Sequence, residues 1–218
     1  MLPPPQGRRG RAAQWMGQVG LVCLAALTVA APANLLPFGV LLLLSTLLVP
    51  DLLWRARPEA GRAASVLGWL TVVVIAAAVA SVLYFDHGLR DVDNRSRLVV
   101  MPWIALWVCA LRLQGHWLWG GALAGLLSVF VLSLAQVLGG APRADLHTNA
   151  IVLADIVVML MVVLLFCRPR GRAAWAAVIV GVCAGGLTIV LTGSRGVFLA
   201  LFAVVLALVF SVRWGSLR

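Results

Sequence analysis

The 218-residue chain is 63% hydrophobic and only 11% charged, and its formal net charge is +10. A soluble globular chain is about half apolar and about a quarter charged, so this composition excludes a single domain with a polar surface. The basic residues stand in short strips between long apolar runs, which favours membrane topology over nucleic-acid binding as the origin of the charge. We therefore expect an all-α, polytopic transmembrane bundle with the lipid bilayer as a partner and no nucleic acid.

A helix needs about 20 consecutive apolar residues to cross a bilayer. On that template the sequence predicts about eight transmembrane helices, at 15–31, 35–53, 63–85, 98–113, 117–138, 149–166, 173–191 and 197–212. A basic tail over 1–14 precedes them, and a short end over 213–218 follows them. The first apolar run with Ala31-Pro32-Ala33 also imitates a secretory signal and its cleavage site, an alternative that leaves the other helices in place.

Arginine sets the predicted orientation, because basic residues accumulate in cytoplasmic loops. With the N-terminus in the cytoplasm, twelve of the 17 basic residues, all of them arginine, lie inside, including those of the predicted loops 54–62 and 167–172. The longest polar stretch, 86–97, has twelve residues, so no loop is long enough to fold by itself. Any chemistry is therefore expected at the membrane surface, in a groove between helices.

Five arginines run against this bias and face outward. They are Arg90, Arg95, Arg97, Arg143 and Arg195. A planar guanidinium can hold phosphate oxygens through paired hydrogen bonds, which gives these residues a functional interpretation. The alternative is surface pairing with the acidic residues of the same loops, namely Asp86, Asp91, Asp93 and Asp145.

One face of the seventh predicted helix leads to Arg195. Its members recur at spacings of four, three, four and three, which places them on one helical face: Gly181, Gly185, Thr188, Thr192 and Arg195. Small residues allow close helix approach, and hydroxyls can then line a cavity. The glycines on both sides of Arg195 let the backbone break, and the start of the next helix favours an anion. The pattern predicts a phosphate site; the alternative is a tight turn whose arginine snorkels to lipid headgroups.

Asp155 is the only acidic residue well inside a predicted transmembrane helix. At about 1.5 Å of rise per residue it lies about 9 Å below the outer edge. A carboxylate at that depth usually faces the bundle interior or water. It could orient an arginine, bind a cation, carry protons or act as a hydrogen-bonded structural residue. On the outer surface, His147 and His87 could serve as general bases near neutral pH, or could simply be solvated.

Two further patterns predict packing. The four cysteines lie in or beside apolar runs without CxxC or Cys/His spacing, so we expect small hydrophobic core side chains and neither a metal nor another cofactor. Gly121 and Gly125 form a GxxxG pair, which is typical of closely packed helices.

Three short outward segments, in chain order, match a known pattern. They are DNRSR at 93–97, RADLHTN at 143–149 and TGSRG at 192–196. The last resembles the TGSRG hallmark of the O-antigen ligase/O-antigen polymerase superfamily, which lies at a helix–turn–helix on the periplasmic face. The first is similar to the family's Asp-x-x-Ser-Arg signature, and the second to the stretch before the helix that precedes the hallmark pair.

This resemblance implies a metal-independent glycosyltransferase in the bacterial inner membrane, with its site facing the periplasm. Such enzymes take a glycan from undecaprenyl diphosphate; ligases transfer it to lipid A–core, polymerases to another repeat unit, and related protein O-oligosaccharyltransferases to a protein hydroxyl. By this likeness Arg195 holds the donor diphosphate, with help from Arg97 or Arg95. The full set of candidate substrate-binding residues is Arg195, Ser194, Arg97, Arg95, Arg143, His147 and Asp155.

The resemblance covers only the N-terminal portion of such proteins. Family members have further helices and a large periplasmic loop with a histidine and another arginine after the matched part. The likeness therefore assigns no catalytic base here, and we expect the 218-residue chain to be inactive alone. Two alternatives come from other functional classes. One is an ion- or proton-coupled transporter that uses Asp155, a class that inverted repeats and broken helices would favour. The other is a non-enzymatic membrane scaffold.

Overall fold

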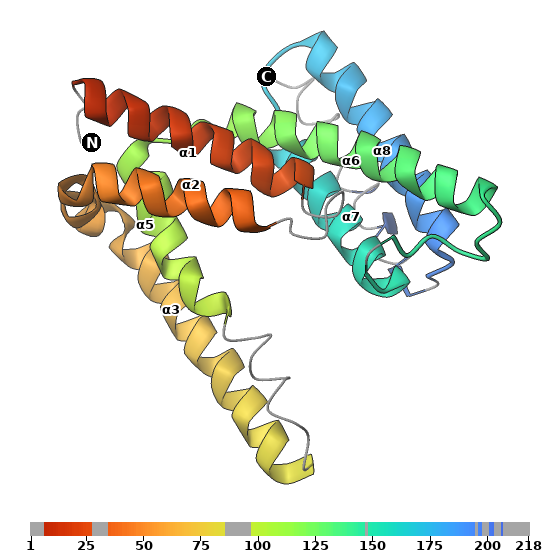
Figure 1. The fold of residues 1–218 in the computed structure, drawn as a ribbon, viewed down its shortest axis with the longest axis horizontal. Helices are drawn as coiled ribbons and strands as arrows, with labels where there is room; N and C mark the ends of the chain where they lie inside the picture. The colour runs from red at the N-terminus through yellow and green to blue at the C-terminus, as the bar shows by residue number, and fades with distance from the viewer. Residues whose placement is uncertain are drawn as a thin grey trace. The chain divides into compact units, whose positions relative to one another are not determined.

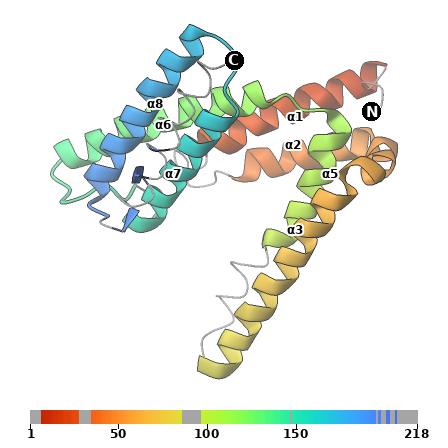
Figure 2. The same cartoon turned by 180° about the vertical axis from the view of Figure 1, so that it is seen from behind.

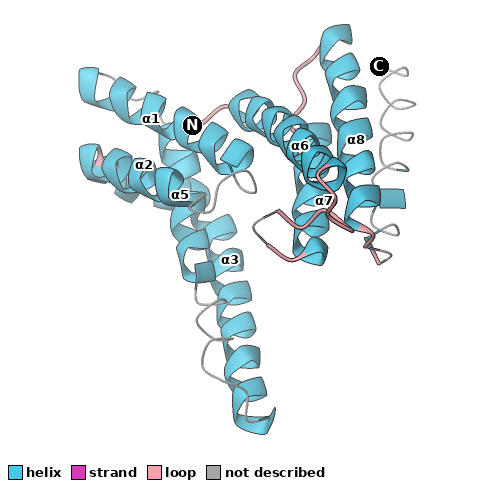
Figure 3. Cartoon of the chain, turned by 45° about the vertical axis from the view of Figure 1, so that its right-hand side comes forward, coloured by secondary structure: helices cyan, strands magenta, loops and turns pink. Residues whose placement is uncertain are grey.

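The computed structural model describes residues 7–27, 35–85, 97–146, 148–194, 196–197, 201–202 and 206. In this part of the chain every regular element is a helix and no strand occurs (Figure 3). Three of the described stretches are long and apolar enough to cross a membrane, namely Ala64–Val82, Gly115–Leu138 and Arg172–Thr192. The all-helical prediction is confirmed for the described residues, whereas the count of eight transmembrane helices stays a prediction.

The chain divides into two compact units. The first comprises Met1–Gly17 and Leu41–Leu113, and the second comprises Gln18–Val40 and Gln114–Arg218. Helices α1 (Arg8–Leu27) and α2 (Leu35–Leu48) each contribute residues to both units. Each unit is described separately below.

In the first unit, α3 (Pro50–Phe85) packs along α5 (Met101–Leu111), which follows the short 3-10 helix η1 (Arg97–Val100) (Figure 1). Trp107 of α5 is fully buried, and its indole N–H donates to the hydroxyl of Ser45 at 2.6 Å. A buried indole needs such an acceptor, because leaving its N–H unpaired costs free energy. The bond therefore joins α5 to the end of α2 that lies in this unit.

Two helices of the described part begin earlier than the apolar runs predicted. α3 is helical from Pro50, so the prediction of a loop at 54–62 is wrong. α1 begins at Arg8, so the second half of the predicted basic tail is also helical. The segment 54–62 contains three arginines, two alanines and one glutamate, which are good helix formers, and Pro50 suits the first position of a helix. The helix also continues through Pro58 and Gly61, which are poor helix formers, so local propensity alone does not account for it. Hydropathy marks the apolar part of a helix and misses such polar extensions.

In the second unit, α6 (Gly115–Leu138), α7 (Ala150–Phe166) and α8 (Arg172–Thr192) pack against one another (Figures 1 and 2). Their shared core consists of aliphatic side chains and one methionine. Its fully buried members include Leu126, Val129, Leu153, Val157, Met161, Leu164, Val178 and Ile189. This core fixes the ends of the three helices with respect to one another.

The GxxxG pair of α6 faces the part of α1 that lies in the second unit. A Cβ atom added to Gly121 would lie 2.8 Å from the carbonyl oxygen of Val22, and one added to Gly125 would lie 2.5 Å from that of Ala25. Real Cβ atoms do not approach backbone atoms so closely, so only glycine permits this crossing. The packing prediction for this pair is confirmed.

The expectation that the cysteines are core side chains is wrong. All four thiols are free, but none is fully buried, and Cys183 is exposed on α8. Cys167, at the end of α7, is half-buried, and desolvation raises the pKa of its thiol above the ordinary value. Because these helices are apolar on every face, composition alone does not reveal which face is packed.

Candidate functional site

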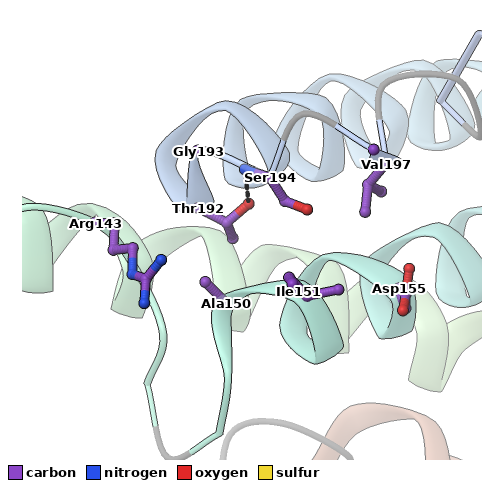
Figure 4. Close-up of a pocket in the computed structure, with 9 residues that line it drawn as sticks. Arg143, Ala150, Ile151, Asp155, Thr192, Gly193, Ser194 and Val197 are labelled. Carbon is purple, nitrogen blue, oxygen red and sulfur yellow. Dashed lines mark hydrogen bonds between the residues drawn. The ribbon is translucent and has the colours of Figure 1, made fainter.

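A pocket of about 400 Å³ opens in the second unit where α7 begins and α8 ends (Figure 4). Three segments contribute to its wall: the loop that joins α6 to α7, the first turns of α7, and the turn after α8. The lining residues are Arg143, Ala150, Ile151, Asp155, Thr192, Gly193, Ser194, Gly196 and Val197.

The loop before α7 is held to the end of α6 by one side chain. Gln136 donates from Nε2 to Asp145 Oδ1 at 2.6 Å. Its Oε1 accepts the backbone N–H of Asp145 at 3.2 Å and that of Leu146 at 3.0 Å. Leu146 has φ +50°, a left-handed conformation that costs free energy in a branched apolar residue and is maintained here by these bonds. The side-chain amide of Gln136 therefore fixes residues 145 and 146 of the loop.

The same loop is also bonded to the last turn of α8. Ala144 is fully buried, and its N–H donates to the carbonyl oxygen of Leu191 at 2.9 Å. The final carbonyls of a helix lack partners within the helix, so this bond satisfies one of them. Arg143 directly precedes Ala144, so this bond also positions Arg143, whose exposed side chain lines the pocket. Among the described residues it forms no ion pair with Asp145, which accepts a hydrogen bond from Gln136 instead.

Asn149 determines where α7 starts. Its backbone is extended, and its Oδ1 accepts the N–H of Ile151 at 3.0 Å, the arrangement of an N-cap. Asp155 follows about one and a half turns into the helix, with its carboxylate exposed on the pocket side. In Figure 4, Arg143 and Asp155 stand at opposite ends of the lining, with Ala150 and Ile151 between them. No ion pair joins these two charges within the described residues, so Asp155 does not orient Arg143.

The turn after α8 is built around Gly193. This residue has φ +66°, which glycine adopts without strain, and its N–H donates to the carbonyl oxygen of Val190 at 3.0 Å. Ser194 donates its N–H to Thr192 Oγ1 at 3.3 Å (Figure 4). Thr192 Oγ1 in turn donates to the carbonyl oxygen of Ile189 at 2.7 Å. The backbone thus breaks where the glycine pattern predicted.

Most of the small-residue face of α8 serves packing rather than the pocket. Gly181 receives the side chain of Leu164, and a Cβ added to Gly185 would lie 2.7 Å from Met161 Sδ. Thr188 is fully buried and donates to its own helix at Ala184. Of the two threonines expected to line a cavity, the pocket includes only Thr192.

Three of the predicted site residues meet in the pocket: Arg143, Asp155 and Ser194. Arg143 comes from the loop before α7, Asp155 from the second turn of α7, and Ser194 from the turn after α8. Arg195 lies outside the described residues, although its chain neighbours Ser194 and Gly196 both line the pocket. The other predicted residues are not placed at this site: Arg95 and His147 are also outside the described part, and Arg97, whose backbone begins η1, belongs to the first unit.

Sequence inspection missed two residues that shape the pocket. Asn149 carried a readable signal, since an asparagine directly before an apolar helical run is a typical N-cap. Gln136 carried a weaker one, because it is the only amide side chain of α6 and stands near its end. Asn149 acts through the backbone N–H of Ile151, and Gln136 acts through two backbone N–H groups and the Asp145 carboxylate.

The pocket offers complementary chemistry at its two ends. The guanidinium of Arg143 and the first turn of α7 favour an anion, whereas the carboxylate of Asp155 only accepts hydrogen bonds. No group of three histidine, cysteine, aspartate or glutamate side chains suited to a metal ion occurs among the described residues. No family model matches this chain, and no curated protein matches it in sequence.

Proposed function

We propose that this chain acts in an O-antigen ligase-like glycosyl transfer in the bacterial inner membrane, with its pocket facing the periplasm. In this proposal the pocket binds the diphosphate of an undecaprenyl-linked glycan donor, and lipid A–core is the acceptor; a polymerase or a protein O-oligosaccharyltransferase would differ in the acceptor. One observation carries the proposal. Two of the three family-like segments, 143–149 and 192–196, contribute Arg143 and the turn at Gly193 and Ser194 to a single pocket.

The electrostatics of the described residues are compatible with a diphosphate. The N-terminus of α7, which carries partial positive charge, faces the pocket together with Arg143. The C-terminus of α8 would repel an anion, but two of its final carbonyls are occupied, Leu191 by the Ala144 N–H and Val190 by the Gly193 N–H. Among the described lining residues, Arg143 carries the formal positive charge and Asp155, at the other end, the formal negative charge.

The transporter alternative receives less support. Coupled transporters typically bind their substrate at helices that are broken near the middle of the membrane. Here α7 and α8 run without interruption from Ala150 to Phe166 and from Arg172 to Thr192, and the pocket lies at their ends. A scaffold without ligand would leave the arginines dispensable, which the following experiment addresses.

The test measures binding of undecaprenyl diphosphate to the chain in lipid nanodiscs. We expect Arg143→Ala to weaken binding about tenfold, because a charge-assisted hydrogen bond to phosphate is lost. Arg170→Ala is the matched control, since Arg170 is also an exposed loop arginine but lies at the opposite end of α7 and α8. It should bind as the wild type does. Equal losses in both variants would indicate only general attraction to basic residues, and a wild type that does not bind would refute the diphosphate site.

A further inference from the structure

Three arginines lie at the end of the second unit that is opposite the pocket, where the loop 167–171 joins α7 to α8. Arg168 and Arg170 belong to this loop, and Arg172 is the first residue of α8. The guanidinium carbon of Arg168 lies 3.8 Å from the centroid of the Trp175 ring, a cation–π contact. Trp175 in turn packs against the hydrophobic core of the unit. The ring therefore holds one of the three guanidinium groups in a defined place.

Arg172 stands beside the same ring. Residues three apart in a helix are neighbours on its surface, so the side chains of Arg172 and Trp175 begin next to each other. Arg170, by contrast, is exposed within the loop. Stacking on the ring uses the face of the Arg168 guanidinium and leaves the N–H donors at its edge for another partner. The backbone thus brings two arginines to one ring, which suits an anion with several acceptor oxygens.

The second unit has no carboxylate side chain that could neutralise these arginines. Its two acidic residues, Asp145 and Asp155, both lie at the pocket end. The distance along α7 from Asp155 to the last residue of the helix is about 16 Å, at about 1.5 Å of rise per residue. An ion pair requires an N···O distance of about 4 Å or less. Among the described residues the edge of Arg168 donates to no acceptor, so its charge is available to a partner from outside the unit.

The surroundings of these arginines are typical of a membrane interface. Phe166, the last residue of α7, is 72% exposed and stands two residues before Arg168. α8, which begins directly after the loop, is one of the stretches long and apolar enough to cross a membrane. Arginine and tryptophan at the end of such a helix lie at the level of lipid headgroups. A phospholipid can therefore place its phosphate at Arg168 while its acyl chains lie along the apolar end of α7.

We propose that Arg168, Trp175 and Arg172 form a site for the headgroup of an anionic phospholipid such as phosphatidylglycerol. This site is independent of the diphosphate pocket at the other end of the unit. Basic sites beside membrane-spanning helices bind such headgroups through charge and through hydrogen bonds to the phosphate. A zwitterionic phospholipid also carries an ammonium group, which the arginines repel and which no carboxylate side chain of the unit accepts at this end. The site therefore selects a headgroup with net negative charge.

The experiment measures binding of single lipids to the full chain in neutral detergent, by fluorescence anisotropy. The probes are phosphatidylglycerol and phosphatidylethanolamine, both labelled on the acyl chain. The wild type should bind phosphatidylglycerol about tenfold more tightly, and Arg168→Ala should reduce this preference to about twofold or less, because charge-assisted hydrogen bonds to the phosphate are lost. Trp175→Leu should weaken the preference in the same way, since the Arg168 guanidinium loses the ring that holds it.

Arg170→Ala is the matched control, because it removes the same charge from the same loop without touching the ring contact. It should change the preference by less than about twofold, since an isolated exposed charge interacts weakly in water. Equal losses in Arg168→Ala and Arg170→Ala would indicate attraction to basic charge in general and would overturn the site. Equal binding of both lipids by the wild type would overturn it as well.

Two further measurements complete the test. Thermal unfolding establishes that Trp175→Leu is folded; an unchanged preference in the folded variant contradicts the proposal, and if it is unfolded the two arginine variants decide alone. An excess of inorganic phosphate, compared with sodium chloride of equal ionic strength, should leave phosphatidylglycerol bound. Displacement by phosphate but not by chloride would assign the site to a free phosphate and refute the phospholipid.

Discussion

Arg143 reaches the pocket because the residue after it is fixed in place. Ala144 is fully buried and bonded through its N–H to Leu191, and Gln136 holds the next two residues. Asp145, the nearest carboxylate in the chain, is occupied by Gln136. The Asp145 carboxylate therefore already has a hydrogen-bond partner, and it forms no ion pair with the Arg143 guanidinium among the described residues. This leaves Arg143 available for the ligand that we propose.

Arg195 stands between two residues that line the same pocket. We predict that Arg195→Ala, in a full-length version that carries the further helices and the periplasmic loop of the family, abolishes glycan transfer while leaving membrane insertion intact, because the donor diphosphate loses a paired hydrogen-bonding group. Arg195→Lys should also be impaired, since an ammonium group does not reproduce the planar fork. Surface glycan is measured by gel electrophoresis and insertion by membrane fractionation, with Arg170→Lys as the control. Normal surface glycan in Arg195→Ala would remove this residue from the mechanism.

The charged members of the pocket could be predicted from sequence, but the supports of the loop could not. Arg143 was found because it runs against the charge bias, and Asp155 because it is a carboxylate within an apolar run. Ala144 acts through its own backbone N–H, which donates to Leu191 of α8, and Gln136 accepts the backbone N–H groups of Asp145 and Leu146 in the irregular loop. Such bonds depend on the path of the loop, which follows no sequence periodicity.

At the scale of helices, the contact between α1 and α6 depends on glycine. We predict that Gly125→Ala lowers the thermal stability of the protein, at a cost of about 1–3 kcal/mol, because the added Cβ meets the Ala25 carbonyl oxygen. Gly120→Ala on the same helix is the matched control, since nothing lies within 4 Å of its added Cβ. It should be neutral or stabilising by up to about 1 kcal/mol, because alanine is the better helix former. The measurement is the midpoint of thermal unfolding of both variants in the same detergent; equal midpoints would contradict the close crossing.

The apolar runs predicted the helices of the second unit well. The bounds of α6, α7 and α8 fall within two residues of those expected from hydropathy. Polar loops flank these helices, so the apolar run and the helix end together. In α3 the helix continues N-terminally through arginine-rich sequence, and there the two signals separate because helix propensity does not require an apolar side chain.

At the scale of the whole molecule, the proposed topology places the two ends of α7 on opposite sides of a membrane. We predict that an impermeant maleimide added from outside labels Pro142→Cys but not Arg170→Cys, in a background where the four native cysteines are replaced by serine. Both positions are exposed, so reactivity should follow the side of the membrane. Labelling after permeabilisation is the control for both. The reverse pattern would overturn the orientation, and outside labelling at both positions would mean that α7 does not span.

The bond between Ala144 and Leu191 has an evolutionary consequence, because it uses backbone atoms only. Position 143 can therefore mutate freely without displacing the loop, whereas position 144 must stay small and must not become proline. The fold therefore tolerates different side chains at position 143 but restricts the residue type at position 144. Under the proposed function, exchanging the residue at position 143 for another type changes the ligand preference of the pocket while the surrounding architecture persists.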